Sequence, residues 1–314
     1  PPAIISIFLG DELTEILKAI EEERAYSGKE KELMKVGAHV LPKFPKDATD
    51  RNRTSPFAFT GNKFEFRMPG SSASISGANI VLNTVVADEL RQFADVLEIA
   101  PDLPSAVHAL IKDTIHGHHR IIFNGNGYDD AWIEEAKKRG LLNLRTTPDA
   151  LPYFIREENI RLFESHGVFN AEEMHSRYEI LMEEYVKTLH IEAQTMIDMT
   201  AKQILPAVSR QIREWSDTLC LKRQVGEQVD TSYEAKAVAM AADLQGAAFA
   251  SMEKLKEEVA SVQQLELEAS AAYYRDVILT RMEELRLSCD ALETMTSAQH
   301  WPFPTYGKLL FGIL

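Results

Sequence analysis

The sequence predicts an α+β fold that carries a large helical insertion. Residues 63–67 alternate charged and aromatic side chains, which is the two-residue period of a β-strand with two different faces. Farther along, three long segments repeat apolar residues at the spacing of one face of an α-helix. We therefore expect an α+β portion over residues 1–190, a helical bundle insertion over 191–297, and a tail over 298–314 that returns to the first portion.

The first portion is expected to combine short strands with helices. Asp11 and Glu12 would lie in the first turn of a helix, and Gly140 suits the left-handed end of another. Residues 25–51 carry charges and helix breakers, which predict a mostly surface excursion. The expected elements are a strand within 3–9, a helix from Asp11, a strand at 63–67 ended by Pro69 and Gly70, helices over about 76–100 and 104–116, a short strand and turn over 121–130, and a helix over 131–139.

The insertion is expected to form a bundle or an antiparallel coiled coil, because each long helix carries one narrow apolar stripe. Pro206 is expected to kink or divide the first helix. Asn170–Glu173 and Thr231–Glu234 have the pattern of a capping box, in which the first and fourth residues bond reciprocally. The stripes are Met182, Val186, Leu189, Ala193 and Met196; Ala248, Met252, Leu255, Val259 and Val262; Ile278, Met282, Leu285, Cys289 and Leu292.

Composition excludes several classes of protein. The 314 residues carry a formal charge of −14, which argues against a general nucleic-acid binder. No run approaches the ~18 apolar residues that a membrane span needs. Cys220 and Cys289 are the only cysteines, so neither a disulfide scaffold nor a cysteine-rich zinc site is expected, and a reducing cytoplasm is favoured. The chain begins PPAIISIFLG, an apolar strand-like run directly after two prolines, so we expect it to be a fragment that starts within a domain.

The stretch RNRTSPFAFTGNKFEFRMPGSS holds the candidate site. On a strand, Glu65 and Arg67 point the same way, about 6.5 to 7 Å apart, although Phe64 and Phe66 make the strand resemble a core element. One explanation is the solvated face of an edge strand, where an ion pair contributes little. Arg53 is only a loop away and Lys63 shares the strand face. Three cations around one carboxylate would suit a site that handles phosphate and carboxylate groups.

Other polar patterns are weaker candidates. His116 and His119 are three residues apart and could form a metal pair, but no third ligand is evident, so a polar helix terminus is favoured. GSSASISG lacks the lysine of a phosphate-binding P-loop and is expected to start a helix. The NGNG segment at 124–127 predicts a turn.

The segment RNRTSPFAFTGNKFEFRMPGSSASISGANIVLNTVVADEL resembles the glutamine synthetases, specifically type III. NGNGYDDAWIEEAKKRGLLNLRTTPDAL and ENIRLFESHGVFNAEEMHSRY continue the resemblance, and HWPFPTYGKLLF is similar to the closing strand of the catalytic domain. The resemblance therefore implies the C-terminal part of that family's distorted β/α barrel, with the long-helix bundle inserted.

The resemblance also implies roles for four residues. Glu65 would be a ligand of the metal beside the nucleotide phosphates, and Arg67 would hold the glutamate substrate or its phosphorylated intermediate. Arg53 would contact both the substrate and the ATP phosphates, and Lys63 would lie near the nucleotide. Another arginine of the family pattern is missing, because its place is taken by Phe57 and Ala58.

The implied reaction is the ATP- and Mg²⁺- or Mn²⁺-dependent ligation of ammonia to L-glutamate through γ-glutamyl phosphate. The implied assembly is a ring of identical subunits, a dodecamer in the full-length protein. One carboxylate cannot supply the about six oxygen ligands of Mg²⁺, so we expect this chain to form one wall of the site and to be inactive alone. The alternative is a stand-alone helical module for oligomerisation or interaction.

Overall fold

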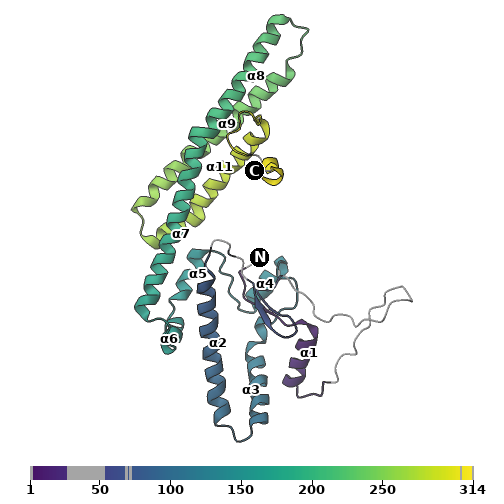
Figure 1. Cartoon of the computed structure of the whole chain (residues 1–314), viewed down its shortest axis with the longest axis vertical. Coiled ribbons are helices and arrows are strands. Elements are labelled where there is room, and N and C mark those ends of the chain that lie inside the picture. Colours follow the sequence, from purple (N-terminus) through teal and green to yellow (C-terminus); the bar gives the residue numbers. More distant parts are fainter. Residues whose placement is uncertain (1–2, 27–53, 68–69, 71–72, 305, 313–314) are drawn as a thin grey trace, which may run out of the picture. The chain divides into compact units, whose positions relative to one another are not determined.

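The computed structural model describes residues 3–26, 54–67, 70, 73–304 and 306–312, shown as ribbons in Figure 1. The chain forms two compact units. Unit 1 comprises residues 1–145 and 153–174, and unit 2 comprises residues 146–152 and 175–314. The described part of the chain is mostly helical and contains one three-stranded sheet.

The elements follow one another along the chain in this order. They are β1 (Ile7–Phe8), α1 (Gly10–Glu21), β2 (Phe57–Phe59), β3 (Phe64–Phe66), α2 (Ile75–Glu98), α3 (Leu103–His118), the 3₁₀ turn η1 (His119–Ile121), α4 (Asp130–Lys138), α5 (Thr147–Phe154), α6 (Glu157–Ser165), α7 (Ala171–Met199), the π-helix η2 (Thr200–Ile204), α8 (Leu205–Val225), α9 (Ser232–Ser261), the 3₁₀ turn η3 (Val262–Gln264), α10 (Leu267–Tyr273), the π-helix η4 (Tyr274–Ile278), α11 (Leu279–Met295) and α12 (Tyr306–Phe311).

The sheet of unit 1 has the order β1-β2-β3, with β1 parallel to β2 and β2 antiparallel to β3. The predicted strands at the start of the chain and at residues 63–67 are confirmed. Of the short strand and turn expected over 121–130, the strand is reduced to one bridge between Ile7 and Ile122. The chain enters this position from η1 and soon reaches the turn closed by the Asp129 N to Asn126 O bond, so it has no length for a ladder.

The start of α1 is fixed by Asn124. Its side-chain Oδ1 accepts hydrogen bonds from the backbone N–H groups of Leu9 (3.1 Å) and Gly10 (3.2 Å). Its Nδ2 donates to Thr14 Oγ1 at 2.8 Å. Gly10 has φ +76°, a conformation that other residues rarely adopt. The amide from the NGNG turn thus satisfies N–H groups that a helix start leaves without partners.

Helix α4 is fixed at both ends. Asp129 accepts from Ala131 N (2.9 Å), and Gly140 at φ +70° takes the left-handed position after the last turn, as predicted. Trp132 is buried and stacks on Phe123 with ring centroids 3.7 Å apart. With Ile4 it forms the small core that joins α4 to the beginning of the chain.

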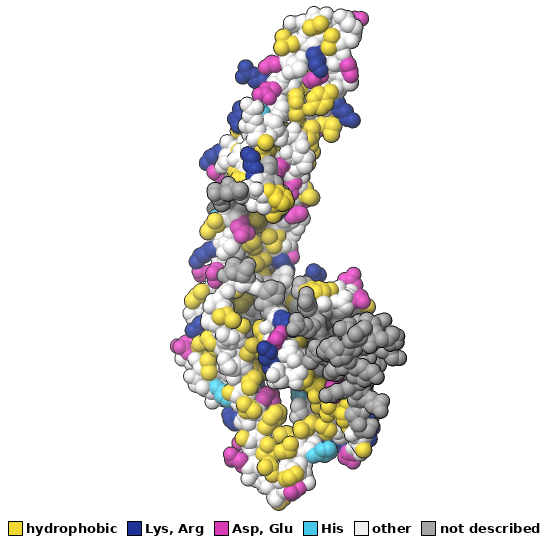
Figure 2. Space-filling view, turned by 45° about the vertical axis from the view of Figure 1, so that its right-hand side comes forward, with side chains coloured by type: hydrophobic (Ala, Val, Ile, Leu, Met, Phe, Trp, Pro, Cys, Tyr) yellow, Lys and Arg dark blue, Asp and Glu magenta, His cyan; other side chains and the backbone are white. Residues whose placement is uncertain are grey.

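Helices α2 and α3 of unit 1 are confirmed close to their predicted bounds, and both start with a side-chain cap. Ser74 accepts from Ser76 N, and Asp102 accepts from Ser105 N. Their apolar residues are largely exposed, and Figure 2 shows patches of hydrophobic side chains on the lower part of unit 1. The exposed ones on these two helices are Ile75, Val81, Val85, Val86, Leu90, Val96, Leu103, Val107 and Ile111. An apolar surface of this kind usually marks a contact with another part of a protein.

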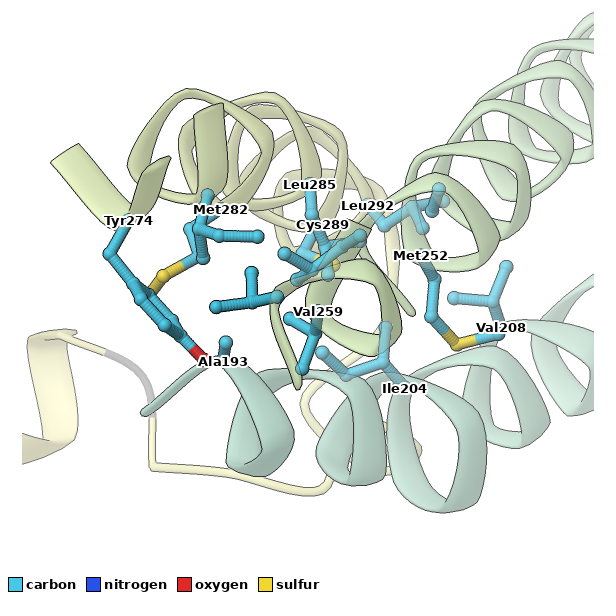
Figure 3. Close-up of a cluster of buried hydrophobic side chains, with 14 of the residues drawn as sticks. Ala193, Ile204, Val208, Met252, Val259, Tyr274, Met282, Leu285, Cys289 and Leu292 are labelled. Carbon is cyan, nitrogen blue, oxygen red and sulfur yellow. The ribbon is translucent and has the colours of Figure 1, made fainter. Parts of the chain in front are cut away.

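Unit 2 is built around α9, on which both α8 and α11 pack. The predicted stripes meet in one core together with residues of η2 and α8. Figure 3 shows side chains of this core pointing toward one another from α7, η2, α8, α9, η4 and α11. Leu255, Ile278, Leu285 and Leu292 are completely buried. The bundle interpretation of these stripes is therefore confirmed, with burial of apolar surface as its main stabilising contribution.

The predicted interruption at Pro206 is also confirmed. Helix α7 ends at Met199, the π-helix η2 follows, and α8 begins at Leu205 with Pro206 in its first turn. Proline has no N–H group, and its ring collides with the carbonyl four residues earlier in a regular α-helix. A wider turn just before the proline accommodates both constraints.

One of the two predicted capping boxes is present. Asn170 Oδ1 accepts from Glu173 N (2.8 Å), and Glu173 Oε2 accepts from Asn170 N (2.9 Å). The second prediction is wrong, because Thr231 makes no capping hydrogen bond and Asp230 accepts from Ser232 N instead. Glu234 is drawn away from the helix start by the ammonium group of Lys222, which donates to it at 2.6 Å.

The tail differs from the predicted closing strand. Residues Tyr306–Phe311 form helix α12, so the strand prediction is wrong. Trp301 lies in the core of unit 2, packed edge-on against Phe303. A six-residue segment without a neighbouring strand has no partners for its backbone N–H and C=O groups, whereas a helical turn pairs them locally. No helix in the described part of the chain is long and apolar enough to cross a membrane.

Two leucines of α11 provide a matched test of the bundle. We expect Leu285→Ala to lower the free energy of unfolding of unit 2 by about 2–5 kcal/mol, because Leu285 is fully buried and truncation leaves a cavity. Leu287→Ala, at a position 62% exposed, should change it by less than about 0.5 kcal/mol. Hydrogen exchange of the α9 amides measures both values, and equal effects would contradict the core assignment.

Candidate active-site strand

The candidate site is carried by the hairpin of β2 and β3. Its register pairs Phe57 with Phe66, Ala58 with Glu65, and Phe59 with Phe64. Thr60 N donates to the Lys63 carbonyl at 2.9 Å, and Gly61 takes φ +95° in the connecting turn. Because the hairpin register is fixed, the direction of every side chain on it is fixed as well.

The two faces of the hairpin carry different chemistry. The four phenylalanines share one face, with ring centroids 4.8 Å apart for Phe57 and Phe66 and 5.2 Å for Phe59 and Phe64. Phe64 is 53% exposed and Phe66 is 37% exposed, so their resemblance to core residues does not hold within this chain. Glu65 is on the other face, opposite the buried Ala58.

Lys63, Glu65 and Arg67 form one charged group, the Glu65 cluster. Arg67 donates to Glu65 Oε2 from Nη2 (2.7 Å) and from Nε (3.2 Å). Lys63 Nζ is 3.8 Å from Oε1 of the same carboxylate. Glu65 and Arg67 therefore point the same way, as the strand period predicts. Two cations on one carboxylate leave the cluster with a net charge of +1, opposite in sign to the chain as a whole.

The Glu65 cluster is half-exposed. The side-chain exposures are 39% for Glu65, 30% for Arg67 and 67% for Lys63. Solvent screens ion pairs of this kind, so they stabilise a fold by about 0–1 kcal/mol. The side chains of Glu65 and Arg67 are exposed enough for a ligand to reach them. The small contribution of their ion pair to stability does not by itself explain why they are placed together.

The other predicted site residues stand as follows. Arg53 lies outside the described residues. At the position of the missing family arginine, the Phe57 ring packs on Phe66 and Ala58 faces Glu65 across the hairpin. A cation at residue 58 would therefore have faced the Glu65 carboxylate, and alanine leaves the charge there to Lys63 and Arg67.

No group of three His, Cys, Asp or Glu side chains in the described part of the chain could hold a metal ion. A carboxylate such as that of Glu65 is a suitable ligand for a hard cation. Mg²⁺ takes about six oxygen ligands, however, so Glu65 alone cannot hold it. His116 contacts Glu21 (Nδ1 to Oε1, 3.3 Å), and His119 Nδ1 bonds the His116 carbonyl oxygen (3.0 Å). These contacts describe the polar helix terminus that the sequence favours.

Sequence reasoning missed how the segment before β2 is anchored. Thr54 Oγ1 accepts from Gly127 N at 2.7 Å, and a Cβ on Gly127 would come within 2.5 Å of the Thr54 carbonyl oxygen. Ser55 Oγ donates to the Phe57 carbonyl at 2.6 Å. The sequence predicts only a turn at Gly127, yet its lack of a side chain permits this close approach. The approach fixes the backbone directly after Arg53.

Comparison with known proteins identifies the class. Residues 106–223 match the family model of the glutamine synthetase C-terminal domain, a region that begins after the Glu65 cluster. Over its whole length the chain is 38% identical to a glutamine synthetase of Butyrivibrio fibrisolvens. It is 36% identical to the Type-3 glutamine synthetase of Dictyostelium discoideum over 99% of its length, and 32% identical to a glutamine synthetase of Bacteroides fragilis over 99%.

These matches place residues 106–223 in the glutamine synthetase C-terminal domain family. Over its whole length the chain is similar to glutamine synthetases, type 3 included. It spans about 45%, 43% and 44% of the lengths of the three relatives. The predicted family is thereby confirmed.

Substitutions at Glu65 and at Ala58, which face each other across the hairpin, compare the contributions of an exposed charge and of buried packing to the stability of unit 1. We expect Glu65→Gln to shift the melting temperature of unit 1 by less than about 4 °C, because a screened ion pair contributes at most about 1 kcal/mol. Ala58→Asn, directly opposite, should destabilise unit 1 clearly more, because it puts a polar amide at a site only 1% exposed. Differential scanning calorimetry measures both shifts. If Glu65→Gln lowered the melting temperature more than Ala58→Asn, the ion pair of Glu65 and Arg67 would instead have a structural role.

Proposed function

We propose that this chain contributes one wall of the active site of an ATP-dependent glutamine synthetase. The complete protein would join ammonia to L-glutamate through a γ-glutamyl phosphate intermediate and release L-glutamine. The carrying observation is the Glu65 cluster on a fixed hairpin, in a chain whose relatives are glutamine synthetases. Because the chain spans less than half of those relatives, the activity is proposed for the complete protein.

Each residue of the Glu65 cluster has a proposed role, and so does Arg53. Glu65 would bind Mg²⁺ or Mn²⁺ beside the nucleotide phosphates, together with ligands from elsewhere in the complete protein. Arg67 would hold the substrate carboxylate or the acyl phosphate, and Lys63 would lie near the nucleotide. Arg53 would bridge the substrate and the ATP phosphates. Phosphoryl transfer depends mainly on positioning and on neutralising the phosphoryl oxygens, which metals and arginines provide.

The hydrogen bonds between Arg67 and Glu65 support these proposed roles. Two N–H groups of Arg67 bond a single carboxylate oxygen, which holds the guanidinium on the same face as the carboxylate. A held guanidinium loses less rotamer entropy when it binds a planar carboxylate or a phosphate. With a metal ion bound as well, Glu65 would still hold Arg67, and the guanidinium would face the anionic substrate on the same side of the hairpin.

The proposal extends to the assembly and to the remaining parts of the fold. The sheet and α1–α4 would belong to a distorted β/α barrel completed by the rest of the protein. The exposed apolar residues of α2 and α3 favour a covered surface, as expected in a ring of identical subunits, here a dodecamer. We place the protein in the cytoplasm, because its cysteines suit a reducing compartment.

The proposed roles can be tested in a chimera. This chain would replace the matching region of the Butyrivibrio fibrisolvens glutamine synthetase, with which it shares 38% identity. We expect Glu65→Gln and Arg67→Lys each to lower kcat for glutamine formation by at least about 100-fold, the loss typical of a preorganised charge at a transition state. Lysine does not reproduce the planar fork of arginine.

Glu12→Gln and Lys138→Gln serve as controls, because they remove exposed charges from the same unit and should leave kcat within twofold. Near-parental kcat in both the Glu65→Gln and Arg67→Lys chimeras would refute the site assignment.

A second candidate function is a helical interaction module without catalysis. It is favoured by the continuous core of unit 2 and by the exposed apolar surfaces of α2 and α3. Titration of Mg-ADP against the isolated chain separates the two candidates. The proposed enzyme predicts a rise in melting temperature that is lost in Glu65→Gln, because a ligand that binds only the folded state stabilises it. A flat response together with defined oligomers in analytical ultracentrifugation would favour the module.

A further inference from the structure

A cleft of about 900 Å³ lies among α1, α3, η1 and α4 of unit 1. Its walls come from α1 through Leu17 and Glu21, from α3 through Ile115, from η1 through His119 and Arg120, and from the end of α4. We call it the Arg120 cleft. None of its lining residues belongs to the Glu65 cluster, so the proposed reaction does not account for it. Its volume lies within the usual range for small-molecule sites.

The backbone around the cleft is held in place. Arg139 Nη1 donates to the carbonyl oxygens of Ile122 (2.9 Å) and Arg120 (3.3 Å). Asn124, another lining residue, bonds the start of α1 as described above. The opposite walls are thus tied to each other by hydrogen bonds. A site whose walls are fixed in advance loses little entropy when a ligand binds.

The two arginines of the cleft differ in what they contact. The guanidinium of Arg139 bonds Glu135 at 2.8 Å and lies 5.3 Å from the Trp132 ring centroid, so its position is set by its neighbours. The guanidinium of Arg120 is exposed and makes no hydrogen bond or ion pair with any described residue. Its backbone is fixed while its charged end is available.

The carboxylates of the cleft are already engaged. Glu135 pairs with Arg139, and Glu21 contacts His116. Lys18 also lines the cleft, at an exposed position where its Nζ lies 3.4 Å from Oε1 of Glu15, a residue outside the lining. His119 uses Nδ1 to bond a backbone carbonyl, so Nε2 is the ring nitrogen that can bond a ligand. With two arginines and one lysine against two glutamates, the lining carries one net positive charge before either histidine is protonated.

Apolar side chains complete the lining. Leu17, Ile115 and Ile122 are half-buried and face the same cleft as Arg120. A bare inorganic ion would leave these side chains in contact with water. A ligand with an apolar body would cover them while its charged end met the guanidinium.

We propose that the Arg120 cleft binds a small organic oxyanion, in which an apolar body carries a phosphate or carboxylate group. Arg120 is the anchor of the oxyanion, because a guanidinium bonds two oxygens of such a group in one plane. His119 and Lys18 flank it, and Leu17, Ile115 and Ile122 contact the apolar body. This adds a ligand site to unit 1 that does not depend on the proposed catalytic function.

Isothermal titration calorimetry on the 314-residue chain tests the proposal, with four probes of graded chemistry. Phenyl phosphate and benzoate combine an oxyanion with an apolar ring, inorganic phosphate lacks the ring, and benzyl alcohol lacks the charge. We expect one or both ringed anions to bind at least about tenfold more tightly than inorganic phosphate, and benzyl alcohol not to bind. The tighter of phenyl phosphate and benzoate identifies the preferred oxyanion.

Matched variants locate the site. Arg120→Gln should weaken binding of the preferred probe at least about tenfold, the loss expected for a charge-assisted bond to an oxyanion. Lys138→Gln removes an equal charge from an exposed position of α4 outside the cleft, and should leave binding within twofold. His119→Gln should weaken binding, whereas His118→Gln, one residue earlier and outside the cleft, should not.

Unchanged affinity in Arg120→Gln would overturn the proposal. So would equal losses in Arg120→Gln and Lys138→Gln, since that result would indicate general charge attraction. Equal binding of inorganic phosphate and both ringed probes, or no binding of either ringed probe at 10 mM, would overturn it as well. Calorimetric melting of each variant verifies that unit 1 remains folded, and Arg120 is exposed enough for this to be expected.

Discussion

The register of the β2–β3 hairpin is the constraint on which the proposed site depends. Pairing Ala58 with Glu65 sends Lys63, Glu65 and Arg67 to one face and the four phenylalanines to the other. A slip by one residue would exchange the two faces and bring aromatic rings where the charges now lie. The register is held by the turn at Thr60–Lys63 and by the Arg67 N to Pro56 O bond of 2.7 Å. The contact between Thr54 and Gly127 then fixes the approach to β2.

Much of this arrangement could be predicted from the sequence, because local rules determine it. The period of two at residues 63–67 places Glu65 and Arg67 together, and the period of the apolar stripes predicts the core of unit 2. Asn170, Gly140 and Pro206 act within one helical turn of their own positions, and each was predicted with its correct consequence. Interactions of this range can be derived from a short window of residues.

The predictions that were wrong have a different physical origin. At those residues the structure depends on partners that are distant in the sequence. Glu234 does not form the predicted capping box, because Lys222 of the preceding helix pairs with it. The segment after Ile121 reaches β1 but forms only one bridge with it, because η1 before it and the turn after it leave no length for a ladder. Tyr306–Phe311 is a helix because it has no neighbouring strand within the described chain. The exposed rings of Phe64 and Phe66 are a further prediction that failed for this reason. An alternating pattern reveals that a face is apolar, but not whether this chain covers it.

The most direct measurement of the central claim exchanges the charges of the hairpin. In the chimera with the Butyrivibrio fibrisolvens relative, Glu65→Arg combined with Arg67→Glu keeps an ion pair on the same face and reverses its ends. If Glu65 is a metal ligand and Arg67 a substrate ligand, the exchanged protein melts within a few degrees of its parent but forms no glutamine. Glutamine formation at the parental rate would contradict the account, because the pair would then serve only to hold the hairpin.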